Sequence, residues 1–287
     1  MSTLTQALHT KTTSRAIVVP AGGPSLSYPE ITEAVRSFQE QLSGAGLQPG
    51  DTVSLALINS LEFVVAFFGI TGAKLVSAPL NPSYSEAEFS FYLEDSKSKV
   101  LLVHNGWTKE QKPAVRAAAK FNVSIYEISW SKEQNRILLH RTAGSQVNGV
   151  NLSSLQATPD DVALLLHTSG TTGRPKGVPL THKNITRTMS NIINTYNLRS
   201  TDTTYLVMPL FHVHGLVCGL LASLKSGGTV VIPPKFSATV FWEEFIEHGC
   251  TWYTAVPTIH QILLRHPTPT NKSKIRFIRS CSSSLAP

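Results

Sequence analysis

Small, hydroxylated and flexible residues gather in one stretch near the middle of the 287-residue chain. The glycines of this stretch let the backbone approach an anion closely, the serine and threonines supply hydroxyl donors, and Lys176 supplies a mobile positive charge. The apolar residues 162–166 directly before it are typical of a strand, and open parallel sheets bind ligands beyond the carboxyl ends of their strands. The pattern therefore predicts a polyphosphate-binding loop made of Thr168, Ser169, Gly170, Thr171, Thr172, Gly173 and Lys176.

The spacing in this stretch does not fit a Walker-type phosphate loop. That motif places its lysine directly after the last glycine, with Ser or Thr next. Here Pro175 stands five positions after Gly170, and Gly177 follows Lys176 instead of preceding it. A kinase or ATPase of the Walker class is therefore disfavoured, while a plain surface loop of the same composition stays open at this point.

Two histidines, His212 and His214, form a second candidate group on either side of Val213. An H-x-H pair can ligate a metal, but a site needs further ligands, and the sequence offers no His or Cys cluster here, so no metal site is predicted. Core histidines that bond the backbone are the ordinary alternative.

Composition limits the classes of function. The chain is 41% hydrophobic and 15% charged, enough apolar material for one or two folded domains and too little charge for disorder. Its formal charge is +7 without any block of five consecutive basic residues, which favours an anionic small molecule over nucleic acid. The three widely spaced cysteines exclude a disulfide framework, and neither a secretory signal nor a membrane-spanning segment is predicted.

Segments with strand and helix patterns alternate along the chain. Residues 53–58 have a strand pattern and residues 61–72 that of a buried helix, and the alternation continues to a strand at 275–279. Repeated βαβ units predict an α/β fold with two mostly parallel sheets covered by helices. We expect a first α/β subdomain over residues 1–158, ending in a polar surface excursion from 130, and a partial second subdomain over 159–287 that carries the phosphate loop.

The residue order of the loop, Thr-Ser-Gly-Thr-Thr-Gly-x-Pro-Lys-Gly, closely resembles the signature of the adenylate-forming superfamily. This superfamily contains acyl-CoA synthetases, luciferases and the adenylation domains of peptide synthetases. Residues 80–82, 208–212 and 255–258 stand in the same order as further family segments. The sequence is most similar to fungal peroxisomal CoA synthetases and plant oxalyl-CoA synthetases, as residues 211–215 and 278–282 indicate.

The resemblance implies an activity and its ligands. In the family, a carboxylate attacks the α-phosphate of Mg-ATP to give an acyl-adenylate, and a thiol, usually coenzyme A, then displaces AMP. ATP, Mg²⁺ and coenzyme A are therefore the expected ligands of an acid–CoA ligase. By resemblance, the residues from Thr168 to Thr172 with Lys176 would hold the β- and γ-phosphates. His212 would be the catalytic or gating residue beside the acyl pocket, and His214 would stand in the pocket wall.

A serine run departs from the family pattern. Many relatives carry Gly-Ala-Ala-Pro where this chain has Cys281 followed by three serines. Because a hydroxyl beside an acyl pocket is costly unless it finds a partner, the run predicts a short polar carboxylate, with oxalate as the specific acid. The expected substrate-binding residues are His212, His214, Ser282, Ser283 and Ser284. A serine-rich turn without a ligand is the alternative.

Later family motifs are missing from the sequence. These are the segment whose glutamate holds Mg²⁺, the aspartate that binds ribose, and the mobile C-terminal domain. We therefore expect an incomplete second sheet and little or no ligase activity from the chain alone. A non-catalytic nucleotide-binding fragment, and a ligase for medium-chain fatty or coumarate-like acids, remain alternatives. By resemblance the location is the cytoplasm or the peroxisome, and no oligomeric state is predicted.

Overall fold

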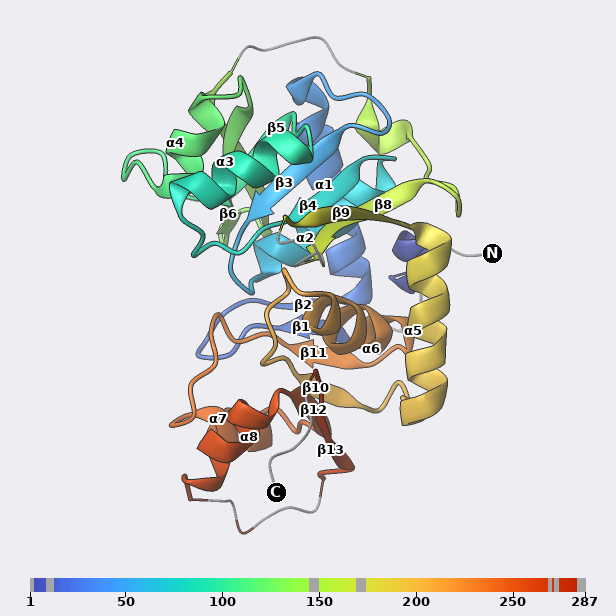
Figure 1. Ribbon diagram of the computed structural model, residues 1–287. Helices are drawn as coiled ribbons and strands as arrows, with labels where there is room; N and C mark the ends of the chain where they lie inside the picture. The colour runs from blue at the N-terminus through green and yellow to red at the C-terminus, as the bar shows by residue number, and fades with distance from the viewer. Residues whose placement is uncertain are drawn as a thin grey trace.

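The strands form two sheets within residues 3–8, 13–144, 150–168, 174–267, 270 and 274–282, which the computed structural model describes (Figure 1). Over these residues one sheet has seven strands, in the order β7-β6-β5-β3-β4-β8-β9, with the antiparallel strands β7 and β9 at its edges. Its members are β3 (Thr52–Ala56), β4 (Val76–Pro79), β5 (Val100–His104), β6 (Ser124–Ser131), β7 (Arg136–Ala143), β8 (Val162–Thr168) and β9 (Lys176–Thr181).

The other sheet has six strands over the described residues, in the order β13-β12-β10-β11-β1-β2. Only β2 runs antiparallel to its neighbour, so this sheet too is mostly parallel. Its strands are β1 (Arg15–Val18), β2 (Ser25–Ser27), β10 (Thr203–Tyr205), β11 (Thr229–Val231), β12 (Trp252–Ala255) and β13 (Phe277–Ser280). The predicted α/β fold with two mostly parallel sheets is confirmed.

Helices cover both sheets (Figure 1). They are α1 (Tyr28–Leu42), α2 (Leu61–Gly72), α3 (Glu86–Asp95), α4 (Pro113–Ala119), α5 (His182–Tyr196), α6 (Ala222–Lys225), α7 (Phe241–Glu247) and α8 (Pro257–Leu264), with the 3₁₀ turns η1 (Leu4–Ala7), η2 (Ser43–Ala45) and η3 (Leu152–Ser154) and the π-helix η4 (His214–Leu221). Helix α2 is buried on all sides, as its uninterrupted apolar sequence predicts. It packs on α1, η1 and the seven-stranded sheet, and one hydrophobic core joins both halves of the chain.

The two sheets do not separate at residue 158, the predicted subdomain boundary. Strands β1 and β2 come from the first part of the chain but lie in the six-stranded sheet, where Ile17 pairs with Val230. Strands β8 and β9 follow the predicted boundary but complete the seven-stranded sheet, where Leu164 pairs with Ser77. Each strand joins the sheet on which its buried face fits, so distance along the chain does not decide the pairing.

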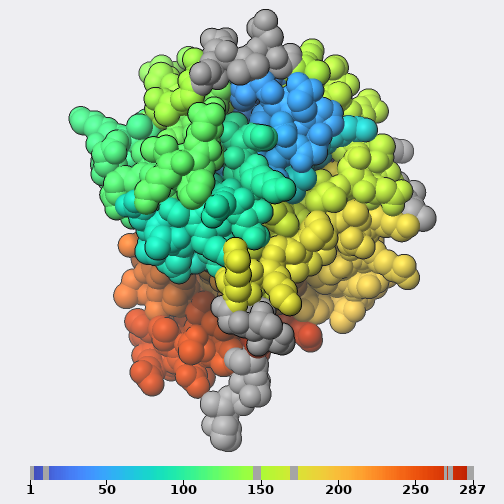
Figure 2. Space-filling view, turned by 45° about the horizontal axis from the view of Figure 1, so that its top comes forward, coloured from blue at the N-terminus to red at the C-terminus, as the bar shows by residue number. Residues whose placement is uncertain are grey.

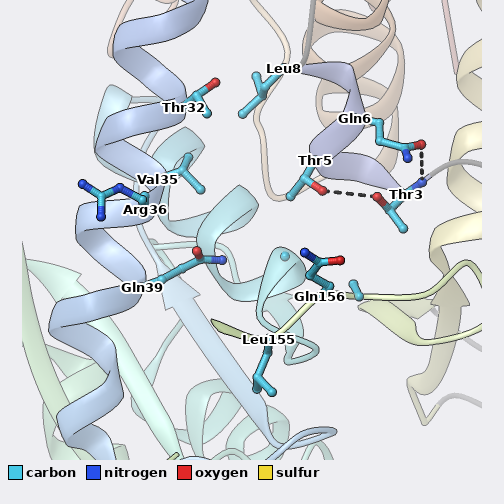
Figure 3. A pocket seen from close by; sticks show the side chains of 12 residues that line it. Thr3, Thr5, Gln6, Leu8, Thr32, Val35, Arg36, Gln39, Leu155 and Gln156 are labelled. Carbon is cyan, nitrogen blue, oxygen red and sulfur yellow. Dashed lines mark hydrogen bonds between the residues drawn. The ribbon is translucent and has the colours of Figure 1, made fainter. Parts of the chain in front are cut away.

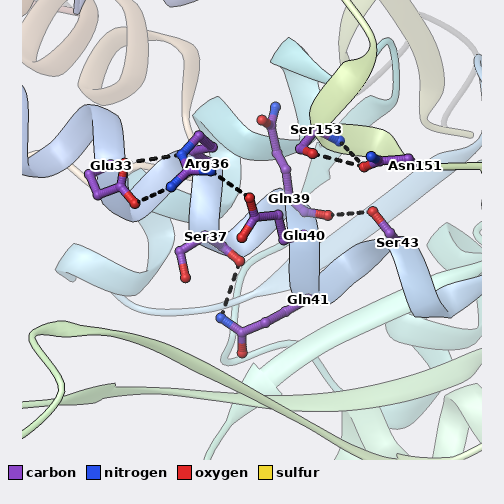
Figure 4. Close-up of polar contacts among 9 residues, drawn as sticks. All are labelled: Glu33, Arg36, Ser37, Gln39, Glu40, Gln41, Ser43, Asn151 and Ser153. Carbon is purple, nitrogen blue, oxygen red and sulfur yellow. Dashed lines mark hydrogen bonds and ion pairs between the residues drawn. The ribbon is translucent and has the colours of Figure 1, made fainter.

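The prediction of an irregular surface excursion at 130–158 is wrong for residues 136–143, because these form the edge strand β7. Gln41 near the end of α1 binds this strand from the side (Figure 4). Its Nε2 donates to Ile137 O at 2.8 Å, and its Oε1 accepts from Leu139 N at 3.0 Å. Ser43 Oγ accepts from Leu152 N at 2.9 Å and fixes the start of η3. Polar side chains at the end of α1 therefore bind the backbone of this region and hold it against the helix.

A buried histidine joins three elements that lie far apart in the sequence. His182, at the start of α5, is fully buried. Its Nδ1 accepts from Leu4 N at 3.1 Å and its Nε2 donates to Thr71 O at 3.2 Å, which fixes the neutral tautomer. Burial lowers the pKa of His182 below its ordinary value.

None of the described helices has the length and apolar character that a bilayer crossing requires.

We expect the neutral state of His182 to make stability fall in acid. Because burial lowers its folded-state pKa below the ordinary 6.5, the unfolded chain takes up the proton first, and the free energy of unfolding drops as pH falls below that value. Urea unfolding at about pH 7.5 and about pH 5.5 measures the difference, which should shrink in His182→Gln. The exposed His140→Gln serves as the control. An undiminished pH effect in His182→Gln would contradict the assignment.

Candidate active site

The carboxyl ends of β3 and β10, one from each sheet, lie side by side. Asn59, in the loop after β3, donates from Nδ2 to Met208 O at 3.1 Å and accepts at Oδ1 from Leu210 N at 2.8 Å. Met208 and Leu210 belong to the segment that follows β10. Parallel sheets bind their ligands at carboxyl ends, so both sheets can contribute residues to one site here.

The predicted phosphate loop connects β8 to β9. Thr168 ends β8, Lys176 begins β9, and the two residues are direct partners in the antiparallel ladder. Both are exposed. The predicted residues Ser169, Gly170, Thr171, Thr172 and Gly173 lie outside the described residues. In Figure 2, the yellow residues that begin β9 reach the surface between the teal part of the first half and the orange part of the second half.

The hairpin of β8 and β9 is fastened to the end of α3. His167 Nε2 lies 2.9 Å from Asp95 Oδ2, and the His167 side chain is only 6% exposed. Its ring also meets the Tyr92 ring at 4.8 Å between centroids. On the other arm, the Arg174 guanidinium lies 5.3 Å from the centre of the Phe91 ring. Both arms of the loop therefore have fixed starting points.

The two predicted histidines start the helical segment that follows β10. His212 is exposed and its ring lies 4.6 Å from the Phe211 ring, centroid to centroid. His214 Nε2 lies 2.9 Å from Thr254 Oγ1 on β12. The His212 ring is partly covered although the residue is exposed, and loss of water around both rings lowers their pKa values; the positive charge of Arg279 lowers that of His214 further. Both histidines are therefore neutral near pH 7 and can donate hydrogen bonds without adding charge.

The segment before η4 packs too closely for any side chain at position 215. A Cβ on Gly215 would meet Pro209 O at 2.2 Å and Met208 O at 2.8 Å. The π-helix η4 begins at His214 directly beside this contact. π-Helical turns are rare in proteins, and those that occur are often found at functional sites. Glycine at position 215 therefore allows the turn with His212 and His214 (the histidine turn) to lie close to the segment that follows β10.

Arg279 is a further candidate site residue, which the sequence analysis did not identify. It pairs with Thr254 across β12 and β13, so the two side chains lie on the same face of the sheet. Its Nε donates to the Tyr196 hydroxyl at 3.2 Å, and its guanidinium lies 4.7 Å from the centre of that ring. No acidic side chain of the described residues forms a salt bridge with it. A cation at the carboxyl end of a predicted strand is the signal that could have identified it.

The chain turns sharply after β13. Cys281 N donates to Ala255 O at 3.0 Å, which extends the ladder by one residue. Ser282 then adopts φ of +69° and is exposed. The hydroxyl of Ser280 is buried and has no hydrogen-bond partner within the described part of the chain. The predicted residues Ser283 and Ser284 lie outside that part.

A polar cavity of about 320 Å³ lies elsewhere, between η1, α1 and residues 155–157 (Figure 3). Several polar groups in its wall bond one another, among them Thr3 N with Gln6 Oε1 at 3.1 Å and the hydroxyls of Thr3 and Thr5 at 3.2 Å. None of the predicted site residues lines it. The described residues also contain no cluster of three His, Cys, Asp or Glu side chains that could hold a metal ion.

Known sequences similar to this chain are CoA ligases. The chain is 41% identical to the oxalate–CoA ligase of Saccharomyces cerevisiae, over 95% of this chain and 54% of that protein. It is 43% identical to the oxalate–CoA ligase of Arabidopsis thaliana, over 100% of this chain and 56% of that protein. The chain thus spans about half the length of these curated relatives.

Solved structures show the same fold. ATP-bound MatB from Rhodopseudomonas palustris matches 98% of this chain and 55% of its own with a TM-score of 0.80 and 24% identity. The N-terminal domain of FACL13 from Mycobacterium tuberculosis matches with a TM-score of 0.83 and 23% identity, over 100% of this chain and 71% of that one. The AMP-binding enzyme family matches residues 5–287, almost the entire sequence. The chain therefore belongs to the family of AMP-binding enzymes.

Proposed function

We propose that the chain is the N-terminal part of an ATP-dependent acid–CoA ligase that acts on oxalate. One carboxylate of the acid attacks the α-phosphorus of ATP, pyrophosphate leaves, and an acyl-adenylate forms. The thiol of coenzyme A then attacks the acyl carbon, AMP leaves, and an acyl-CoA thioester results. Family membership and 41–43% identity to two oxalate–CoA ligases support this proposal.

The hairpin of β8 and β9 would bind the polyphosphate. Thr168 and Lys176 lie at the two ends of the loop. Among the described residues, no acidic side chain forms a salt bridge or hydrogen bond with either of them. A mobile ammonium can therefore neutralise phosphate oxygens as charge moves onto pyrophosphate. Mg²⁺ bound to ATP would add further neutralisation, and the described residues supply no metal cluster of their own.

Arg279 is the observation that carries the choice of acid. Oxalate has a second carboxylate, which keeps its charge while the first reacts. The Arg279 guanidinium is held against Tyr196, lies near His214 and lacks an acidic partner among the described residues. An arginine can bind such a carboxylate through two parallel N–H···O bonds. A fatty acid offers no group for this cation, which would lose water without compensation.

His212 and His214 would complete the acid side of the site. His214 is held by Thr254 and can present a neutral ring to the pocket. His212 is exposed at the start of the same turn, where a neutral donor can orient the reacting carboxylate. We propose Ser282, Ser283 and Ser284 as further donors to a polar acid. We propose a location in the cytoplasm or the peroxisome.

The first expected result concerns acid preference. The ligase that carries this chain as its N-terminal part should catalyse ATP–pyrophosphate exchange faster with oxalate than with octanoate or coumarate. The reason is that only oxalate offers a second carboxylate to Arg279. The 287-residue chain alone, tested in parallel, should show little or no exchange. Faster exchange with octanoate would sink the substrate assignment.

The second expected result isolates the Arg279 cation. In Arg279→Gln, kcat/KM for oxalate should fall by about tenfold to a hundredfold, because a charge-assisted bidentate contact is lost. Exchange supported by octanoate should not fall. Arg136→Gln is the matched control, since Arg136 lies on the edge strand β7 and bonds Gln134 there. Equal losses of activity with oxalate and with octanoate would show that Arg279 does not bind the second carboxylate.

The third expected result concerns Lys176. In Lys176→Met, KM for ATP should rise by about tenfold, because one cation at the phosphates is worth on the order of 1–2 kcal/mol. KM for the acid should change little. Lys183→Met, at the exposed start of α5, is the control. An unchanged ATP dependence in Lys176→Met would remove the lysine from the nucleotide site.

A further inference from the structure

We infer that Asn59 is a positioning residue, whose side-chain amide fixes the segment carrying His212 and His214 against the end of the seven-stranded sheet. The inference rests on the proposed function, since it assigns Asn59 to the alignment of acid with nucleotide. Asn59 itself need not touch either substrate.

The contacts of Asn59 bridge residues about 150 positions apart. Its Oδ1 accepts from Leu210 N at 2.8 Å, and its Nδ2 donates to Met208 O at 3.1 Å. The amide thus takes the place of a backbone partner for the Met208–Leu210 segment. An asparagine suits this task because its side chain offers one acceptor and one donor side by side.

The backbone around Asn59 is held on both sides. Ile58 N donates to His104 Nε2 at 2.9 Å at the end of β5. Ser60 caps α2, and its hydroxyl accepts from Phe63 N at 3.2 Å. Burial lowers the pKa of His104, so the ring is neutral and Nε2 can accept this bond. The Asn59 amide is therefore presented from a rigid end of the sheet.

The segment that Asn59 grips transmits its position to the histidines. His212 N donates to Pro209 O at 3.2 Å, and Leu216 N donates to His212 O at 3.0 Å. Leu210 is fully buried, and Gly215 packs against the carbonyls of Met208 and Pro209. These contacts join Met208 and Leu210 directly to residues 212–216, so a shift of Met208 moves His212 and His214 with it.

The consequence for catalysis follows from where the two substrates would lie. The nucleotide side is carried by the hairpin of β8 and β9, which His167 and Asp95 fasten independently to α3. The acid side is carried by the six-stranded sheet and by the segment after β10. Loss of the Asn59 bridge should therefore misplace the acid relative to the α-phosphorus and leave ATP binding intact. Misplacement by about 1 Å can cost on the order of a hundredfold in rate.

The experiment compares Asn59→Ala and Asn59→Asp in the complete ligase by ATP–pyrophosphate exchange, with oxalate and ATP varied separately. Asn59→Ala removes both bonds. Asn59→Asp keeps the acceptor for Leu210 N but replaces the donor by a negatively charged oxygen that repels Met208 O. The control is Asn151→Ala, because among the described residues the Asn151 side chain bonds only Ser153, two positions along the chain (Figure 4). Thermal unfolding is followed for every variant.

We expect kcat/KM for oxalate to fall by about tenfold or more in both Asn59→Ala and Asn59→Asp, while KM for ATP stays within about twofold. Activity in Asn151→Ala should match the parent. A lower unfolding temperature with unchanged kinetic constants would overturn the inference, and so would equal rises in the two KM values. If Asn59→Ala does not fold, the oxalate and ATP constants of Asn59→Asp decide alone by the same criteria.

The two proposals fail in different ways. If the parent ligase shows no oxalate-dependent exchange, the proposed function fails. If the parent is active and both Asn59 variants keep its constants, the function stands and only the positioning role falls.

Discussion

Two hydrogen bonds from one amide join the carboxyl ends of the two sheets, and the candidate site depends on this contact. Asn59 grips Met208 and Leu210 at the point where the chain leaves β10 for the histidine turn. Sheets that met elsewhere would leave the β8–β9 hairpin and the segment that carries His212 and His214 on separate surfaces. The shared hydrophobic core, which includes residues from η1 to β12, keeps the halves together through contacts that have no preferred direction. The Asn59 amide adds two directional contacts at the carboxyl ends of the sheets.

The site divides into a nucleotide side and an acid side with different supports. The nucleotide side stands on local anchors: His167 with Asp95, and Arg174 with Phe91. The acid side stands on long-range contacts, in which Tyr196 holds Arg279 and Thr254 holds His214. This division fits the chemistry, because phosphate binding is common to the family while the acid differs among its members. Residues proposed to bind the acid could then be substituted without altering the proposed phosphate-binding hairpin.

Local patterns were enough to predict most elements and the fold class. Helix α2 is apolar all round and β3 is a short apolar run between turn residues, so both were expected where they lie. The assignment of strands to sheets could not be predicted in this way, because the pairs of β1 with β11 and β4 with β8 join distant residues. Among site residues, Thr168, Lys176 and the two histidines follow from sequence motifs. The position of Arg279 at the end of a predicted strand was a signal in the sequence, but its contact with Tyr196, 83 positions away, and those of Asn59, about 150 positions away, become visible only in the structure.

The most direct test of this description is a crystal structure of the ligase with oxalate and a non-hydrolysable ATP analogue. We expect one oxalate carboxylate to face the α-phosphorus and the other to lie about 3 Å from the guanidinium nitrogens of Arg279. The phosphate chain should lie between Thr168 and Lys176. A second carboxylate bound away from Arg279, or phosphates bound away from the β8–β9 hairpin, would contradict the proposed site.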